Sequence, residues 1–247
     1  MMGPTHAAGG LAAGLALATW AGTDLPTAVA LGGICAGAAL LPDMDHPSGT
    51  LARMYGPVTK LASTLVNRLS SAVATATGGG RRIGGHRTAT HFPLLAVPAA
   101  VATGAAAAAA ADAGNDRGLW AVLFLMMSLA LAGLMTEKTR ALGFLGTAVA
   151  AAGLSWATVH SAPMSLTAEL LTAAMGLGVA IHLLGDALTK QGIPWFGPLK
   201  IGGRRWKNIA ILGPMSIRTS SWADYAVGSA CIVASGYLLL GFLGFTF

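Results

Sequence analysis

Seven long apolar stretches, separated by short polar segments, dominate the sequence. They cover residues 6–22, 25–41, 92–111, 118–135, 141–158, 168–187 and 224–245. Each has about 17 residues or more, the length at which an α-helix crosses the hydrocarbon core of a bilayer. The pattern predicts an all-α, polytopic membrane bundle of about seven spans, forming one domain over residues 1–247. The first two stretches are short and rich in Ala and Gly, so a hairpin that dips through a thinned interface is the alternative for them.

A different pattern separates the second apolar stretch from the third. Apolar residues recur at helical spacing at positions 58, 61, 65, 69 and 73, and polar residues fill the other faces. This periodicity predicts an amphipathic helix over residues 58–77 that lies on the membrane surface. A lid packed over the bundle is the alternative. Residues 78–85, rich in Gly and Arg, are predicted to form a flexible linker.

Composition agrees with a membrane protein, and the positions of the basic residues predict its orientation. Hydrophobic residues make up 54% of the chain and charged residues only 10%, with a mean hydropathy of +0.66. Segments 42–91, 136–140 and 188–223 hold 14 of the 15 Lys and Arg residues, and in a seven-span bundle all three lie on one side. By the positive-inside rule that side is cytoplasmic. We therefore predict an N-in, C-out protein of the bacterial cytoplasmic (inner) membrane.

The same charge distribution indicates which partners the chain has. The net charge of +6 comes from the basic cytoplasmic face, which suits the anionic headgroups of membrane lipids. Lipids are therefore the expected partners, and nothing in the sequence requires nucleic acid.

Histidines and acids gather in four short clusters, all at predicted cytoplasmic helix ends. The clusters are His6; Asp43, Asp45 and His46; His86 and His91; and His182 and Asp186. Ionisable groups at membrane depth are costly and usually mark a functional site. The orientation was derived from Lys and Arg alone, so the meeting of these clusters on one face is an independent observation. We expect the eight side chains to converge.

The residue types in these clusters are those of a metal centre. His182 and Asp186 are spaced i, i+4, so a helix presents both on one face, and Pro47 ends the segment that carries Asp43, Asp45 and His46. Imidazole and carboxylate ligands suit Zn²⁺ best, with Mn²⁺ or Fe²⁺ as alternatives. Eight ligands are too many for one tetrahedral ion, so we predict two divalent ions with room for water.

Arg87 lies four residues before His91, where its planar guanidinium could hold an anionic oxygen of a substrate. Metal ions that activate water, together with a cation that neutralises charge in the transition state, are the machinery of phosphoester hydrolysis. Asp45 and Arg87 are accordingly the predicted catalytic residues.

Four motifs, in order along the chain, carry a family resemblance. "TH" near the start, "LPDMDHP", "HRTATH" and "HLLGDALTKQGI" resemble the YdjM-like family of inner-membrane metal-dependent hydrolases. The resemblance implies a membrane-bound metal-dependent hydrolase. It assigns functional positions to His6, Asp43, Asp45, His46, His86, Arg87, His91, His182 and Asp186. The scattered His and Asp residues, with an HxxxD helix, are also similar to the zinc-dependent phospholipase C group.

These observations predict a membrane hydrolase that cleaves a phosphoester, derived from a lipid, at the cytoplasmic face. A metal-ion transporter or metal sensor would need the same kinds of residue, but a transporter places its ligands near the membrane midplane in broken helices. A membrane scaffold with a structural metal is the third possibility, and it requires a site closed to water.

Overall fold

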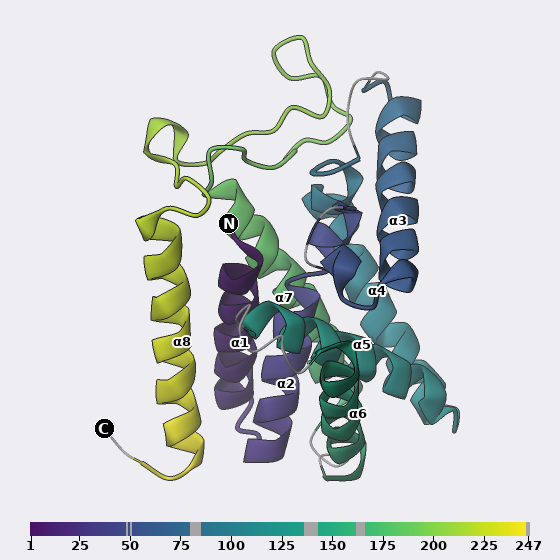
Figure 1. Cartoon of the computed structure of the whole chain (residues 1–247), viewed down its shortest axis with the longest axis vertical. Helices are drawn as coiled ribbons and strands as arrows, with labels where there is room; N and C mark the ends of the chain where they lie inside the picture. The colour runs from purple at the N-terminus through teal and green to yellow at the C-terminus, as the bar shows by residue number, and fades with distance from the viewer. Residues whose placement is uncertain (48, 50, 80–84, 136–142, 162–165, 246–247) are drawn as a thin grey trace.

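The computed structural model describes residues 1–47, 49, 51–79, 85–135, 143–161 and 166–245. The long helices are α1 (Gly3–Trp20), α2 (Leu25–Ala38), α3 (Pro57–Ala76), α4 (Pro93–Asp112), α5 (Asp116–Leu134), α6 (Gly143–Ser161), α7 (Ala168–Ala187) and α8 (Trp222–Phe242) (Figure 1). Short 3₁₀ turns are η1 (Pro42–Asp45), η2 (Leu51–Arg53), η3 (Ala89–His91) and η5 (Gly213–Met215). The described part of the chain contains isolated β-bridges but no strand, which confirms the predicted all-α class.

Five segments are long and apolar enough to cross a membrane. They are Leu25–Asp45, Pro93–Asp112, Asp116–Leu134, Ala168–Ala187 and Trp222–Phe242. Each of the seven predicted stretches coincides with a helix, but α1 and α6 do not belong to this set. Helix α1 is 18 residues long, and its polar residues Thr5, His6 and Thr19, together with four glycines, make it less apolar than the five candidate spans. The structure thus supports five spanning helices, and the predicted total of about seven is not confirmed.

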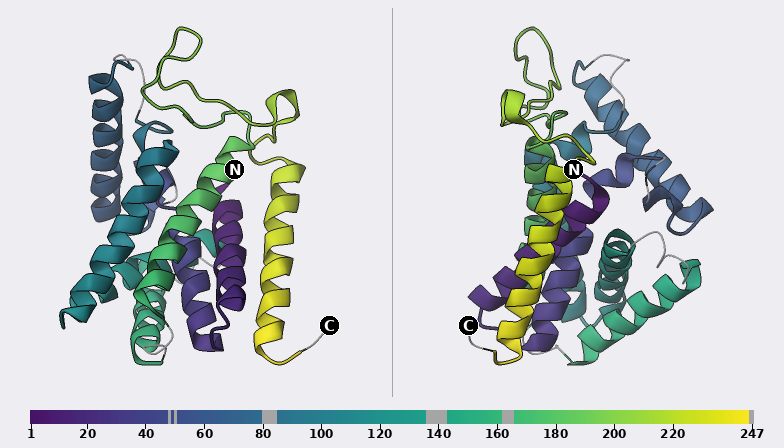
Figure 2. Two further views of the ribbon diagram at one scale, coloured as in Figure 1. Left: turned by 180° about the vertical axis from the view of Figure 1, so that it is seen from behind. Right: turned by 60° about the vertical axis from the view of Figure 1, so that its left-hand side comes forward.

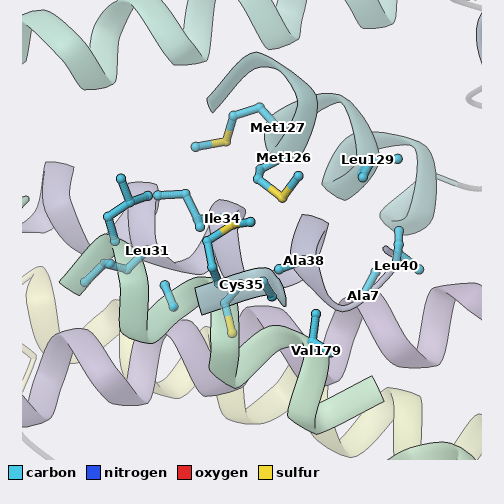
Figure 3. Close-up of a cluster of buried hydrophobic side chains, with 14 of the residues drawn as sticks. Ala7, Leu31, Ile34, Cys35, Ala38, Leu40, Met126, Met127, Leu129 and Val179 are labelled. Carbon is cyan, nitrogen blue, oxygen red and sulfur yellow. The ribbon is translucent and has the colours of Figure 1, made fainter. Parts of the chain in front are cut away.

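Helix α2 lies at the centre of the bundle and packs against α1, α5 and α7. Gly33 and Gly37 of α2 lie against Met127 and Met126 of α5. The buried Cys35 points away from Met126, towards Gly14 of α1, and Val179 of α7 closes the same core (Figure 3). Glycine permits several close approaches to α2: a Cβ atom on Gly10 of α1, for example, would lie 2.6 Å from the carbonyl oxygen of Cys35. This packing fixes the end of α2 beside the start of α1 and the end of α7.

Helix α3 confirms the predicted amphipathic helix, since it spans Pro57–Ala76. Its apolar stripe points away from the bundle: Val58, Leu61 and Leu65 are 73%, 61% and 50% exposed. Its small residues Ser63 and Ser70 are buried instead, on the side that packs against η1, η2 and η3. A lid would pack its apolar stripe against the bundle. The outward stripe of α3 therefore favours the alternative, a helix that lies on the membrane surface. Most of the predicted linker 78–85 lies outside the described residues.

The connection between α7 and α8 doubles back on itself beyond the end of the bundle, at the top of Figure 1. Figure 2 shows the same arrangement from two further directions. Isolated bridges pair Ile193 with Ile209 and Thr189 with Ile217. Within this connection, the buried Trp206 donates a hydrogen bond to the Thr77 hydroxyl, at the end of α3, over 2.9 Å. The connection therefore ties α3 to the end of α7.

Candidate metal centre

The four predicted clusters meet at one end of the bundle, beside the N-terminus in Figure 1. The first turn of α1 carries His6, η1 carries Asp43 and Asp45, the segment around η3 carries His86 and His91, and the end of α7 carries His182 and Asp186. Five of these side chains are buried: His6, Asp45, His91, His182 and Asp186. The convergence expected from the sequence is therefore present.

Four of the converging residues form a compact cage of ligand atoms. His91 Nε2 and His182 Nε2 lie 3.2 Å apart. Asp186 Oδ2 lies 3.4 Å from the first nitrogen and 3.5 Å from the second, and Asp43 Oδ1 lies 3.8 Å from each. Ligand atoms bound tetrahedrally at about 2.0–2.2 Å from an ion are separated from one another by roughly 3.3–3.6 Å. The observed separations fit a single tetrahedral ion.

Two details of the cage indicate that its atoms are oriented to bind a cation. Asp186 Oδ2 is buried and has no hydrogen-bond partner, a condition that costs about 1–3 kcal/mol for a polar group. His182 Nδ1 donates a hydrogen bond to the carbonyl oxygen of Ala39 over 2.7 Å. This bond fixes the tautomer and leaves the lone pair of His182 Nε2 directed into the cage, as is usual for a metal-binding histidine.

The other oxygen of Asp186 is held by three nitrogen atoms. The Met1 amino group lies 2.6 Å from Asp186 Oδ1, Arg87 Nη2 lies 2.8 Å from it and His6 Nε2 lies 3.2 Å from it. His6 also stacks on the ring of His182, with centroids 3.9 Å apart. These contacts place His6 behind the cage, where it orients two ligands. Its predicted role as a ligand is not supported by this position.

Arg87 occupies a strained backbone conformation, with φ at 54°, which is uncommon for a residue other than glycine. Its Nη1 atom donates to the Thr189 hydroxyl over 3.3 Å and to the Gly192 carbonyl over 3.2 Å, while Nη2 bonds Asp186. Both terminal nitrogens are thus engaged by the protein, and only Nε lacks a partner. The sequence predicted that Arg87 would bind an anionic oxygen of the substrate. In the structure its two terminal nitrogens bind the protein instead, and one of them holds Asp186 of the cage.

Asp45 joins His86 and His91 in a second group whose potential ligand atoms lie within 4.8 Å of one another. Asp45 Oδ1 lies 2.7 Å from His86 Nδ1, and Oδ2 accepts hydrogen bonds from the Arg87 backbone N–H and the Thr90 hydroxyl. His91 Nδ1 is farther away, 3.7 Å from Oδ2. Asp45 is fully buried and both its oxygens are occupied, so it anchors the turn that delivers His91.

A cavity of about 180 Å³ opens beside the cage. Its lining consists of Gly3, Pro4, Leu40, Asp43, His46, Gly49, Leu51, Ala132 and Gly133. The Asp43 side chain is 25% exposed, whereas those of His91, His182 and Asp186 are inaccessible. Asp43 is thus the edge of the cage that solvent reaches. His46 packs edge-on against His86, with centroids 4.7 Å apart, and it lines the cavity outside both groups of potential ligands.

The electrostatics of the cage favour a cation. Burial lowers the pKa of His91, but the nearby carboxylates of Asp186, Asp43 and Asp45 outweigh it and raise that pKa to about 10. Three carboxylates around one imidazole create a strongly negative environment. A divalent ion would compensate this charge at the point where the ligand atoms converge.

Several supporting groups were not identified from the sequence. Thr90 bonds Asp45 and lies 3.1 Å from His91 Nδ1, while Asn67 of α3 donates to the Asp45 carbonyl over 2.7 Å. Thr90 could have been suspected because it directly precedes a predicted ligand. The positions of Asn67 and of the Ala39 carbonyl depend on helix packing, so no local pattern signals them.

A match to a known protein family covers every residue of the site. The model of the family described as "YdjM inner membrane protein" matches residues 1–246, a range that includes every cage residue. The chain matches no curated protein and no solved structure.

Proposed function

The chain belongs to the YdjM inner membrane protein family, and we propose that it is a metal-dependent hydrolase that cleaves a phosphoester, derived from a lipid. Its apolar helices and its family make it a multi-pass inner-membrane protein. The observation that carries the proposal is the cage: two imidazole nitrogens and two carboxylate oxygens that lie within 4.8 Å of one another, beside a cavity. Two nitrogen and two oxygen donors suit Zn²⁺, with Mn²⁺ and Fe²⁺ as alternatives.

We propose one ion in the cage. The sequence led us to expect two, and the second group, Asp45 with His86 and His91, is where a second ion would bind. That ion would require His91 to bind through both ring nitrogens and Asp45 to release hydrogen bonds that it already accepts. A single ion in the cage requires neither of these changes. Asp45 is therefore more simply explained as a positioning residue than as a catalytic one.

The residues around the cavity have distinct roles in the proposed reaction. A bound divalent ion would lower the pKa of water and polarise a phosphoryl oxygen. Asp43 is the cage residue that faces the cavity, and His46 lies on the same wall, where its imidazole can accept or donate a proton. Leu40, Leu51 and Ala132 form apolar walls that limit the entry of water. Arg87 keeps Asp186 in the cage through the 2.8 Å bond to Oδ1.

A metal sensor or scaffold is the second candidate function. The cage supplies four protein donors, and four-coordinate protein sites are typical of structural zinc. A transporter is less well supported, because the donors come from helix ends at one end of the bundle and not from broken helices at its middle. Hydrolysis distinguishes an enzyme from both alternatives.

Activity should depend on the ion and on the cavity histidine. We expect the purified protein in lipid nanodiscs to release product from lipid phosphoesters, to lose this activity on dialysis against a chelator and to regain it with Zn²⁺. His46→Ala should lower kcat by about 10²–10⁴-fold, the usual contribution of a general acid–base group, while metal content stays normal. His160→Ala, at an exposed histidine on α6, is the matched control. If chelation or His46→Ala left turnover unchanged, the proposed hydrolysis at this site would be wrong.

We also propose the N-in orientation with seven spans. It is supported by the shared position of α3 and the α7–α8 connection, which carry most of the basic residues and lie at the same end as the N-terminus in Figures 1 and 2. Reporter fusions after residues 79 and 210 should report the cytoplasm, and one after residue 114 the periplasm. A reversed result at any one of these sites would contradict the topology.

A further inference from the structure

An apolar groove of about 340 Å³ lies between α3 and α4, and residues of η1 line both this groove and the cavity beside the cage. Its lining consists of Leu41, Pro42, Val66, Leu69, Ser70, Val73, Ala89, Thr90, Leu95, Ala96, Ala99, Ala100, Thr103 and Val179. Val66, Leu69, Ser70 and Val73 in the second half of α3 supply one wall, and the first half of α4 supplies the other. We propose that this groove binds one acyl chain of a membrane phospholipid.

The polar groups in the lining are already satisfied within the protein, which favours an alkyl ligand. The Ser70 hydroxyl donates to the Gly85 carbonyl over 2.7 Å, the Thr103 hydroxyl donates to the Ala99 carbonyl over 2.8 Å, and the Thr90 hydroxyl donates to Asp45. A polar ligand or an extended peptide would find no free hydroxyl donor among them, so its carbonyl groups would be buried without hydrogen bonds. A hydrocarbon chain has no polar groups that need hydrogen-bond partners.

The length of the groove suits a single alkyl chain. From Leu95 to Thr103 the groove follows α4 for about 12 Å, given the rise of an α-helix. A single alkyl chain is narrow enough to enter.

The direction of the groove matches that of a lipid in a bilayer. Helix α4 is a candidate membrane span, and Thr103 lies near its middle, whereas Thr90 lies just before its start. A chain in the groove would therefore have its methyl end towards the membrane centre and its ester end towards the interface. The ester end would lie against Thr90, whose hydroxyl is 3.1 Å from His91 Nδ1. The lipid site thus adjoins the wall of the metal centre, and it stands whether or not that centre hydrolyses anything.

Photo-crosslinking tests this inference without reference to activity. The full-length protein is placed in nanodiscs of phosphatidylcholine that carries a diazirine at mid-chain, irradiated and analysed by peptide mass spectrometry. We expect labels to concentrate on the groove residues of α3 and α4, well above the level on the lipid-facing helix α8. Each buried methylene contributes about 4-fold in affinity, so a phenyl ring that displaces two of them should lower groove labelling by about 15-fold.

Two pairs of variants provide the comparison. Ala99→Phe fills the groove from α4, and Ala102→Phe adds the same ring to an exposed position of that helix outside the groove. Leu69→Gln changes the α3 wall, and Leu61→Gln is its equally exposed control. The exposed leucine pair tests the site even if Ala99→Phe fails to fold. Equal labelling in the test and control variants, labels spread evenly onto α8, or covalent dimers that show a second copy in the groove would each overturn the proposal.

Discussion

His182→Ala is expected to remove the bound metal almost completely. The substitution deletes one of two imidazole nitrogens in the cage and leaves Asp186 Oδ2 with one nitrogen neighbour fewer. Each donor of a tetrahedral site contributes strongly to affinity, and a three-donor remnant buried in a membrane bundle has no ready replacement ligand. Metal analysis of the purified variant by mass spectrometry should give a metal content near background.

The control for this change is His160→Ala, which removes an exposed histidine that bonds only the Trp156 carbonyl in the described structure. It should retain the metal content of the unmodified protein. Thermal unfolding of both variants with excess chelator separates metal loss from misfolding, because a folded apo-protein should give a similar transition in each. A His182→Ala protein that still bound one ion with unchanged affinity would exclude this residue from the centre.

Arg87→Ala is expected to weaken the metal site by about 10–100-fold in affinity, the usual effect of losing a partner that orients a ligand. Its guanidinium bonds Asp186 Oδ1 while Oδ2 faces the cage, and its backbone N–H bonds Asp45. The truncation also leaves a buried carboxylate short of one cation, which costs roughly 3–5 kcal/mol for a buried ion pair. Competition with a coloured chelator measures the affinity, and chemical denaturation measures the free energy of unfolding.

Arg87→Lys separates charge from geometry at this position. Lysine restores a positive charge but lacks the planar fork that reaches Asp186, Thr189 and Gly192 together. We expect it to recover part of the stability and little of the metal affinity. Arg218→Ala, at an exposed arginine of the α7–α8 connection, should change neither quantity. If Arg87→Ala kept full metal affinity and lost only turnover, Arg87 would act on the substrate, as the sequence had suggested.

Hydrophobic periodicity was sufficient to predict the helices. Stretches such as 118–135 are long and contain no charged residue, so their helical structure depends little on tertiary context. The amphipathic pattern of residues 58–77 predicted α3 equally well. It could not predict which side of α3 packs on the protein, because the buried side is formed by small residues such as Ser63 and Ser70. Nor could it separate a helix such as α1 from a full membrane span.

The sequence also predicted that the histidine and acid clusters would meet, because topology places their helix ends on one face. It did not predict how each ring is turned. His6 and His182 both lie near Asp186, yet only the hydrogen bond from His182 to the Ala39 carbonyl directs a lone pair into the cage. That carbonyl is exposed to the ring by the end of α2, a consequence of packing between helices distant in sequence. The division into ligands and supporting residues therefore required the structure.

X-ray absorption at the metal edge of the purified protein tests the central claim most directly. With one ion held by Asp43, His91, His182 and Asp186, the spectrum should show four or five nitrogen and oxygen neighbours at about 2.0–2.2 Å, with outer-shell scattering from two imidazoles. Metal analysis of the same sample should give one ion per chain. A sample without metal above background, or a spectrum with sulfur neighbours or without imidazole scattering, would contradict the account.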